Sequence, residues 1–269
     1  MAGGKTPAND LAALLERIEQ VEGRGADACG GRAEAVRPGL PRPLDRLERG
    51  MLHEWLCGGD DEEDGRPWTA PILVFTHLAA IAARENSSGG RLVWIGRRVW
   101  PQPHLLVRPS APCGHDLLNR SLLIDPPTLD DRLWAIALSL RSPSVAAVIA
   151  DVSGMGMAHS RRLQLAAESG DAVALFARPW RERRQHTAAA RRWRIQPAPS
   201  SNASPRWEIE LVRCKGVQRG GRMDACAKLI VEHDHATHCL RAPADVADRS
   251  RPEAGSTIAQ RPEPIRQTG

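Results

Sequence analysis

A chain of 269 residues can fold as one large domain or two small ones, and its 42% hydrophobic residues and eight tryptophans can fill a substantial core. The six cysteines form no CxxC pair, and there is no signal peptide and no apolar run of membrane length, so we expect a cytoplasmic protein with reduced thiols and no membrane association. The net charge of +5 is carried almost wholly by arginine, which suits phosphate and carboxylate recognition, although GC-rich coding bias produces the same pattern and we favour that cause for most of the arginines.

The N-terminal part of the chain predicts an amphipathic helix followed by a linker. A helix from about Leu11 to Glu22 would place one apolar stripe on a single face (Leu11, Leu14, Leu15, Ile18 and Val21). Residues 24–43 are rich in Gly, Ala, Arg and Pro, which is typical of a linker. We therefore assign residues 1–36 to an N-terminal helix and linker. The helix is either a lid packed on the main domain or a separate docking element, and packing within the chain is the commoner use of such a stripe.

Residues 37–241 predict the main domain. Its first expected elements are strands at 51–57, 91–95 and 121–124 and helices at 69–84 and 129–140. The helix at 69–84 is apolar almost all round, so we expect it to be buried. In the helix at 129–140, Thr128 and Asp131 have the pattern of a capping box. The residues expected on the inner face of that helix are Leu133, Trp134, Ala137 and Leu138.

The centre of the domain is a predicted β-α-β unit. The apolar run 145–150 ends at Asp151, and after a short turn a helix closed by Gly170 leads to a second apolar run at 172–177. Apolar runs without alternation indicate parallel strands that are buried on both faces. Ligands of such sheets bind beyond the carboxyl ends of the strands, which is where Asp151 and the arginine-rich segment 178–187 lie.

The C-terminal third predicts antiparallel strands and a tail. Segments 191–196 and 207–213 alternate apolar and polar residues and are expected to be antiparallel edge strands, and a last strand is expected at 228–233. Residues 242–269 lack apolar periodicity and predict a disordered tail. The expected fold class is therefore α/β, with a mostly parallel sheet, helices on both faces and antiparallel C-terminal strands.

This order of elements resembles the RecA-like ATPase core, and four stretches make the chain similar to one family with that core. The stretches are 50–54 (GMLHE), 160–168 (SRRLQLAAE), 192–200 with its RWR and PAPS pieces, and 205–216 with its PRW and ELVRCKG pieces. In this order they resemble the ImuA family, the RecA/SulA-like accessory proteins of bacterial error-prone translesion synthesis. The resemblance implies a role in the DNA-damage (SOS) response and a polymerase-like partner of the ImuB type. RecA and a specialised DNA polymerase are implied as further partners.

The loop that would bind nucleotide is incomplete. A P-loop reads GxxxxGK[ST], in which backbone, Lys and Ser/Thr hold the phosphates and the magnesium ion. The loop after the first strand has Gly58 and Gly59 but no lysine before Thr69. It also carries five consecutive acidic residues, which would repel a triphosphate.

The other residues expected around a nucleotide point the same way. In RecA a glutamate closes the second strand and orients the attacking water, whereas here Arg97 and Arg98 stand near that place. Asp151 matches the metal-linked aspartate after an apolar strand, although an Asp in that position is more often a helix cap or turn former. We therefore expect a degenerate nucleotide site, no cofactor and no enzyme activity.

The arginine-rich segment 178–187 (RPWRERRQHT) follows the fifth parallel strand, where RecA places a DNA-contacting loop. A flexible basic segment with a tryptophan for base stacking suits single-stranded DNA, and a solvated surface loop is the alternative. The residues predicted to contact DNA are Trp180, Arg181, Arg183 and Arg184. Arg191, Arg192 and Arg194 could extend the patch, with Trp193 facing the core opposite them.

A cluster of potential metal ligands lies near the end of the domain. It consists of His233, His235, His238 and Cys239. Their spacing matches no zinc-finger pattern, and residues 234–236 are typical of a hairpin turn, so no metal site is expected.

These observations lead to the hypothesis of a non-catalytic RecA-like adaptor for translesion DNA synthesis, with single-stranded DNA as a second ligand. Two alternatives stay open. One is a divergent P-loop-like ATPase that acts on DNA, and the other is a SulA-like cell-division inhibitor that binds the tubulin-like division protein.

Overall fold

The computed structural model describes residues 44, 47–58, 68–86, 90–107, 117–200, 204–215, 228–237 and 239–243. All of them belong to the unit Gly39–Gly269. The predicted N-terminal helix and linker, and the predicted tail apart from residues 242 and 243, lie outside the described residues.

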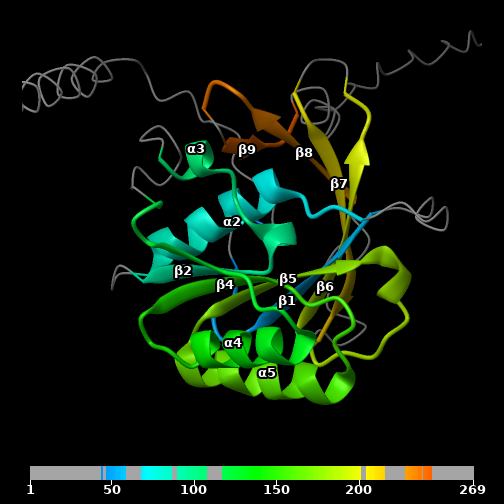
Figure 1. Cartoon of the computed structure of the whole chain (residues 1–269). Helices are drawn as coiled ribbons and strands as arrows, with labels where there is room; N and C mark the ends of the chain where they lie inside the picture. Colours follow the sequence, from blue (N-terminus) through cyan, green and yellow to red (C-terminus); the bar gives the residue numbers. More distant parts are fainter. Residues whose placement is uncertain are drawn as a thin grey trace, which may run out of the picture. The chain divides into compact units, whose positions relative to one another are not determined.

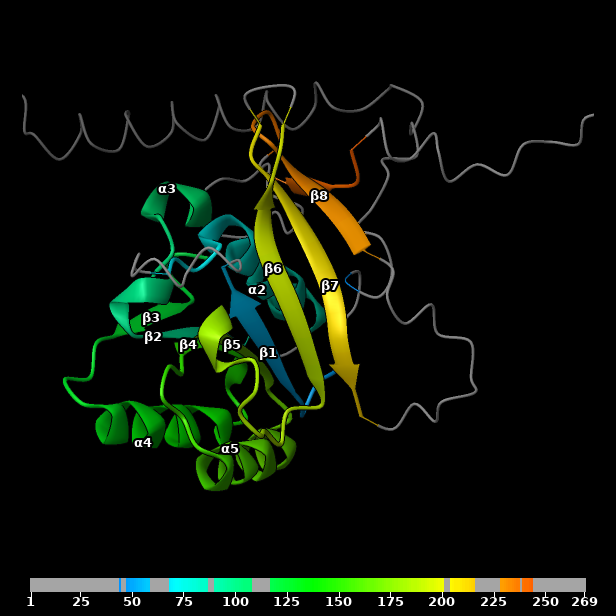
Figure 2. The same ribbon diagram turned by 90° about the vertical axis from the view of Figure 1, so that its right-hand side faces the viewer.

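The described residues form a nine-stranded sheet in the order β3-β2-β4-β5-β1-β6-β7-β8-β9 (Figures 1 and 2). The first six strands in this order run parallel to one another, and β7, β8 and β9 continue the sheet antiparallel. The strands are β1 (Leu52–Cys57), β2 (Arg91–Ile95), β3 (Ser121–Ile124), β4 (Val145–Asp151), β5 (Val173–Pro179), β6 (Arg191–Ala198), β7 (Arg206–Cys214), β8 (Lys228–Asp234) and β9 (Cys239–Arg241). The predicted mostly parallel sheet with an antiparallel end is confirmed.

Helices cover both faces of the parallel part of the sheet (Figure 1). On one face lies α2 (Ile72–Glu85), with the short α3 (Pro103–Leu106) beside it, and on the other lie α4 (Leu129–Leu140) and α5 (Met157–Gly170). Two short 3-10 helices, η2 (Arg97–Val99) and η3 (Trp180–Glu182), follow β2 and β5. In the part of the chain that the structure describes, no helix is both long and apolar enough to cross a membrane.

The core explains why these segments fold where they do. Every residue of β4 and of β5 is buried, which confirms the predicted β-α-β unit of two neighbouring parallel strands joined by α5. The helix α2 is buried from Val74 to Ala83, as its apolar sequence predicts. Above the sheet, Trp55 of β1 stacks on Trp193 of β6 with ring centroids 5.4 Å apart, and Phe75 meets Trp55 edge-on at 5.9 Å.

The position of β6 differs from the sequence-based expectation of an antiparallel edge strand. β6 runs parallel to β1 on one side and antiparallel to β7 on the other, so it lies inside the sheet. Arg191 and Arg192 are buried, and Arg192 makes a hydrogen bond from Nε to Glu54 Oε2 at 3.0 Å, whereas Arg194 and Gln196 are half-buried. The polar face of β6 therefore begins in a buried ion pair at Arg192 and is half-buried at Arg194 and Gln196.

The inner face of α4 is also partly different from the prediction. Thr128 caps the helix as expected, with its hydroxyl accepting a hydrogen bond from the Asp131 backbone at 3.2 Å. Trp134 and Leu138, however, are 66% and 56% exposed. The residues of α4 that face the core are Leu133, Ile136, Ala137 and Leu140. The apolar stripe of α4 that packs on the sheet is therefore rotated about the helix axis, by about one residue position, from the predicted stripe.

Two of the stretches that resemble the ImuA family, 50–54 and 160–168, meet in space. Gln164 of α5 accepts a hydrogen bond from the Leu52 backbone at 3.2 Å and donates one to the Gly50 carbonyl at 3.0 Å. It also donates to Glu168 at 2.9 Å. Through these hydrogen bonds, residues 160–168 of α5 hold the amino end of β1 in place.

One histidine joins α2 to the C-terminal hairpin. His77 is buried, and its Nδ1 accepts a hydrogen bond from the Leu240 backbone at 3.3 Å. Burial, with smaller contributions from the charges of His233 and Arg84, lowers the pKa of His77 to about 4. The folded state therefore holds His77 neutral, and protonation would convert its acceptor nitrogen into a donor.

Acid should weaken the fold through this residue. Because the folded pKa lies below the unfolded value near 6.5, the stabilisation is fully present above pH 6.5 and is lost as the pH falls toward 4. Between pH 7 and pH 5 we expect His77 alone to lower the free energy of unfolding by about 2 kcal/mol. Denaturant titrations of the wild type and of His77→Gln at both pH values check this. An equal pH dependence of the two proteins would contradict it.

Candidate functional site at the carboxyl ends of the parallel strands

The residues predicted to form a nucleotide site lie at the carboxyl ends of β1 and β4. Gly58 directly follows β1, adopts a positive φ of 102°, and donates its backbone N–H to the Ile195 carbonyl of β6 at 3.2 Å. Thr69 is exposed and precedes Pro71, the residue that caps α2, so it lies outside the helix. Gly59 lies outside the described residues.

Asp151 at the end of β4 already has a full set of partners. Its Oδ1 accepts hydrogen bonds from the Ser153 backbone at 2.9 Å and from the Ser153 hydroxyl. Its Oδ2 lies 3.3 Å from Arg98 Nε and 3.5 Å from Arg132 Nη1. The carboxylate is buried, forms the turn after β4, and is flanked by two guanidinium groups, so both of its oxygens are engaged by this chain.

Arg98, in the 3-10 helix after β2, links Asp151 to the segment before α2. Besides Asp151, it donates from Nη1 to the Trp68 carbonyl at 3.0 Å and covers the Trp68 ring at 4.8 Å. Arg97 points elsewhere and pairs with Asp125 at 2.5 Å. A guanidinium group therefore stands beside the Asp151 carboxylate.

A buried ionic network lies deeper, between β1, β5 and β6. Glu54 and Arg178 are both completely buried, and Arg178 Nη1 lies 3.2 Å from Glu54 Oε1. The second oxygen of Glu54 accepts from Arg192, and the second nitrogen of Arg178 lies 2.7 Å from Glu182 Oε2. Two carboxylates thus balance two guanidinium groups. Burial, with the charge of Arg178 adding to it, lowers the pKa of Arg192, while the charge of Glu54 opposes this shift.

Hydroxyl and backbone groups complete this network. Thr187 donates to Glu54 Oε1 at 2.5 Å and lies 2.8 Å from the hydroxyl of Ser160, a residue of α5. Glu182 Oε1 accepts the Gly154 backbone N–H at 2.9 Å, and Arg178 donates to the Met155 carbonyl at 2.9 Å. The segment after β5 is therefore tied to the turn after β4.

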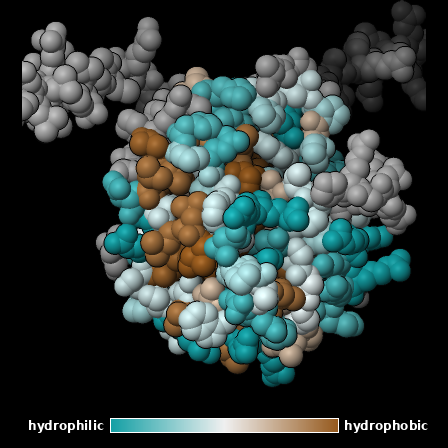
Figure 3. All heavy atoms as spheres, in the orientation of Figure 1, coloured by the Kyte–Doolittle hydropathy of each residue, from teal (hydrophilic) through white to brown (hydrophobic). Residues whose placement is uncertain are grey.

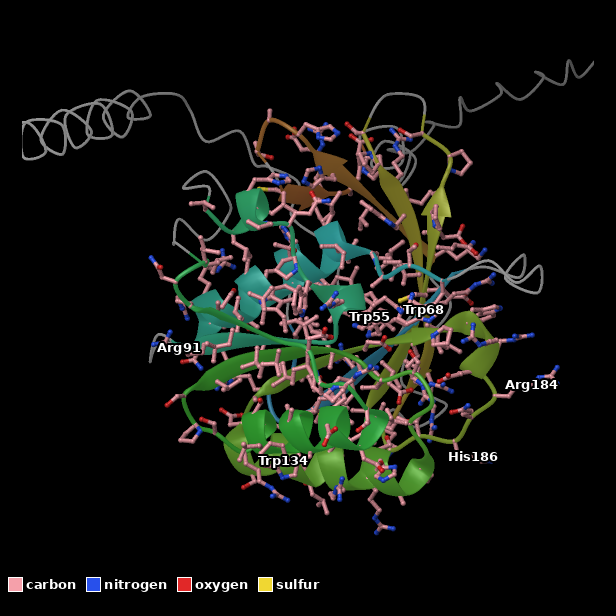
Figure 4. All side chains as sticks on the ribbon, in the orientation of Figure 1. Trp55, Trp68, Arg91, Trp134, Arg184 and His186 are labelled. Carbon is pink, nitrogen blue, oxygen red and sulfur yellow. The ribbon has the colours of Figure 1, made fainter. Side chains whose placement is uncertain are left out.

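The basic segment, residues 180–187, lies on the surface above this network. Arg181, Arg184 and His186 are exposed, and Figure 4 shows Arg184 projecting away from the domain with His186 nearby. Trp180 is half-buried, with the guanidinium carbons of Arg183 and Arg194 at 5.0 Å and 4.3 Å from its ring centroid. One aromatic ring and several arginines therefore gather on one surface.

Three features of this segment differ from the sequence-based picture. It begins with η3, and its backbone is held by a residue of β6, because Arg192 donates to the Arg183 carbonyl at 2.9 Å. Arg178, the first residue of the arginine-rich stretch, belongs to β5 and is buried in the ionic network. Arg192 is committed to Glu54, so it does not extend the surface patch, whereas Arg194 reaches it through Trp180.

Sequence reasoning missed the ionic network and the role of Arg132. Glu54, in a strand whose other residues except His53 are apolar, was the available signal, because a charged residue in a fully buried strand needs a partner. The partners lie more than a hundred residues away in the chain, so spacing could not identify them.

The C-terminal histidines form a hairpin, as predicted. β8 and β9 pair antiparallel, and the Asp234 carboxylate accepts the Ala236 backbone N–H at 2.9 Å in the turn. The rings of His233 and His235 meet edge-on at 5.1 Å, and His238 lies outside the described residues. Among the residues that the structure describes, no three His, Cys, Asp or Glu side chains are grouped to hold a metal ion.

Comparison with known proteins identifies the fold and the family. No family model matches the chain. The crystal structure of the RadB recombinase superposes with a TM-score of 0.50 at 12% identity, covering 73% of this chain and 92% of that one, which confirms the RecA-like fold. Proteins named Protein ImuA from two strains of Caulobacter vibrioides are 30% identical to this chain, over 77% of its length and 85% of theirs. The chain therefore belongs to the ImuA family.

Proposed function

We propose that this protein is a non-catalytic RecA-like accessory protein of damage-induced, error-prone translesion DNA synthesis. It would act in the cytoplasm as an adaptor that binds a polymerase-like ImuB-type partner. RecA, a specialised DNA polymerase and single-stranded DNA are further ligands in this proposal. Membership of the ImuA family and the RecA-like fold support it.

The observation that carries the non-catalytic part of the proposal is the environment of Asp151. A metal-linked aspartate must offer a carboxylate oxygen to the hydrated ion that bridges the phosphates. Here Ser153 occupies one oxygen, and Arg98 and Arg132 flank the other. The loop before α2 adds no lysine and places Thr69 outside the helix. Binding, rather than nucleotide hydrolysis, is the activity that this arrangement supports.

Genetic complementation tests this function. In a strain that lacks the protein, we expect fewer mutations after DNA damage, and expression of the wild type should restore them. The Thr69→Val variant should restore them equally, because the hydroxyl that a P-loop would need for magnesium has no role here. A tagged wild-type protein should also copurify with the ImuB-type protein to the same extent with and without ATP and magnesium. Failure of Thr69→Val, or a complex that requires ATP, would contradict an adaptor.

The basic segment is the proposed contact for single-stranded DNA. Changing Arg181, Arg183 and Arg184 together to Ala should weaken binding, and each lost phosphate contact should reduce the slope of log affinity against log salt by about 0.7. Arg91→Ala is the control for loss of an arginine elsewhere, because Arg91 is also exposed but begins β2, at the amino ends of the strands. Fluorescence anisotropy with a labelled oligonucleotide at several salt concentrations measures both quantities.

Trp180 should contribute differently from the arginines. Its replacement by Ala should lower the affinity at every salt concentration. The slope of log affinity against log salt should change by less than the loss of one phosphate contact would change it, because base stacking releases no counterions. Equal affinity and equal slope in the triple arginine variant would remove the segment from DNA binding. If the partner complex is then lost instead, the arginines meet an acidic protein surface.

A further inference from the structure

The edge strand β3 and the helix α4 each expose apolar side chains. Leu122, Leu123, Trp134 and Leu138, here called the β3–α4 surface, are each between 44% and 66% exposed. Leu122 lies on the α4 side of the sheet, because Ile124, two residues further along the strand, packs into the same core cluster as α4. Leu123 points to the opposite, α2 side, as does Ser121, which accepts a hydrogen bond from Trp94. Figure 3 shows hydrophobic residues gathered on the face toward the viewer, and Figure 4 places Trp134 on α4 below them.

The backbone of β3 has one hydrogen-bonding side toward β2 and one toward the outside. The carbonyls of Arg120 and Ile124 accept bonds from β2 and from the residue after it, each at 2.9 Å. Backbone groups alternate in direction along a strand, so the N–H and C=O of Leu123 point away from β2. In the described part of the chain no strand lies beyond β3. An outward-facing strand edge flanked by apolar side chains is a template for pairing with another strand.

Charges are separated along this surface. On α4, Asp130, Trp134 and Leu138 follow one another at helical spacing, and Arg141 follows the last turn on the same flank. The stripe thus begins with a carboxylate and ends with a guanidinium group. β3 does not add to this order, because Arg120, which precedes it, donates to the carbonyls of Gly90 and of Ala83 in α2. Asp125, which follows β3, is paired with Arg97, whose side chain is 78% exposed. Asp130 and Arg141, both on the flank of α4, are therefore the charges considered for a contact.

We propose that two copies of this chain form a two-fold symmetric dimer through the β3–α4 surface, with the two β3 strands antiparallel. A two-fold axis places the same patch against itself in opposite directions. The apolar centre then meets its own copy, and Asp130 of each chain faces Arg141 of the second copy. A head-to-tail parallel contact would bring like charges together instead. This self-complementary charge order selects a second copy over an unrelated partner.

Sedimentation velocity over about 1 to 100 μM protein tests the dimer, in the concentration range of standard-sized but weak interfaces. The wild type should reach the mass of two chains at the upper end of this range. Trp134→Asp should weaken association by at least about tenfold, because it buries a charge at the centre of the contact. Leu165→Asp is the matched control, since Leu165 is 59% exposed on α5, outside the surface, and should leave association unchanged.

Exchanging the charges tests the antiparallel arrangement itself. Asp130→Arg and Arg141→Asp should each weaken self-association by about tenfold or more, because each places like charges opposite one another. Mixing these two variants should give a mixed dimer, and a chain that carries both changes should associate like the wild type. Thermal melts check that each variant is folded. If Asp130→Arg does not fold, the Arg141→Asp and Trp134→Asp variants test the proposal without it.

Two results would overturn the dimer. One is a wild type that remains a single chain over the whole range of protein concentration. This includes the case in which Trp134→Asp loses binding to the ImuB-type partner and nothing else. The other is self-association that neither the charge exchange nor Trp134→Asp changes, which would place the contact elsewhere on the chain.

Discussion

Replacing Glu54 with Gln should lower the free energy of unfolding by about 3–5 kcal/mol, the loss expected when one partner of a buried ionic pair is removed. Glu54 is completely buried and meets both Arg178 and Arg192, so the amide would leave two guanidinium groups with one carboxylate between them. A loss of this size is a large fraction of the stability of an ordinary domain. Denaturant titration measures it where the variant still folds, and the yield of soluble protein measures it otherwise.

Glu48→Gln is the matched control for this change. Glu48 also pairs with an arginine, Arg191, but its side chain is 46% exposed, so the loss should stay below about 1 kcal/mol. The double variant Glu54→Gln with Arg192→Gln should lose less than the sum of the two single variants, because the charges balance again. Equal losses in Glu54→Gln and Glu48→Gln would show that the network contributes no more than a surface pair.

The second large effect is expected at the tryptophan stack. Trp193→Ala should lower the free energy of unfolding by about 3–5 kcal/mol, because it leaves a cavity against Trp55 in the centre of the sheet. Trp193→Phe should lose clearly less, since an aromatic ring still packs on Trp55. Trp134→Ala, at a 66% exposed position, should change stability by no more than about 0.5 kcal/mol in dilute solution. Similar losses in Trp193→Ala and Trp134→Ala would contradict the role of the stack.

The fold could be predicted where local sequence and burial agree. The runs that became β4 and β5 are apolar without interruption, and such runs have few other solutions than buried parallel strands. The prediction was wrong for Trp134 and Leu138, because an apolar stripe at helical spacing does not say which of its flanks meets the sheet. It was wrong for β6 because alternation is the same whether the polar face meets water or a buried counter-charge.

The location of the site was predictable from the sequence, but the pairing of its charged residues was not. Asp151 and the basic segment lie at the carboxyl ends of the strands, as open parallel sheets require. The sequence could not show which charged residues form ion pairs inside the domain. Arg178 and Arg192 look like surface arginines in the sequence, yet Glu54 holds both, and only tertiary contacts decide this.

Nucleotide binding tests the central claim most directly. Isothermal titration of the wild-type protein with ATP and magnesium, up to about 1 mM nucleotide, should give no binding isotherm, because Asp151 is engaged by Ser153, Arg98 and Arg132. Asp151→Ala should give the same flat titration. A micromolar affinity in the wild type that disappears in Asp151→Ala would contradict the claim, because it would show that Asp151 serves a working nucleotide site.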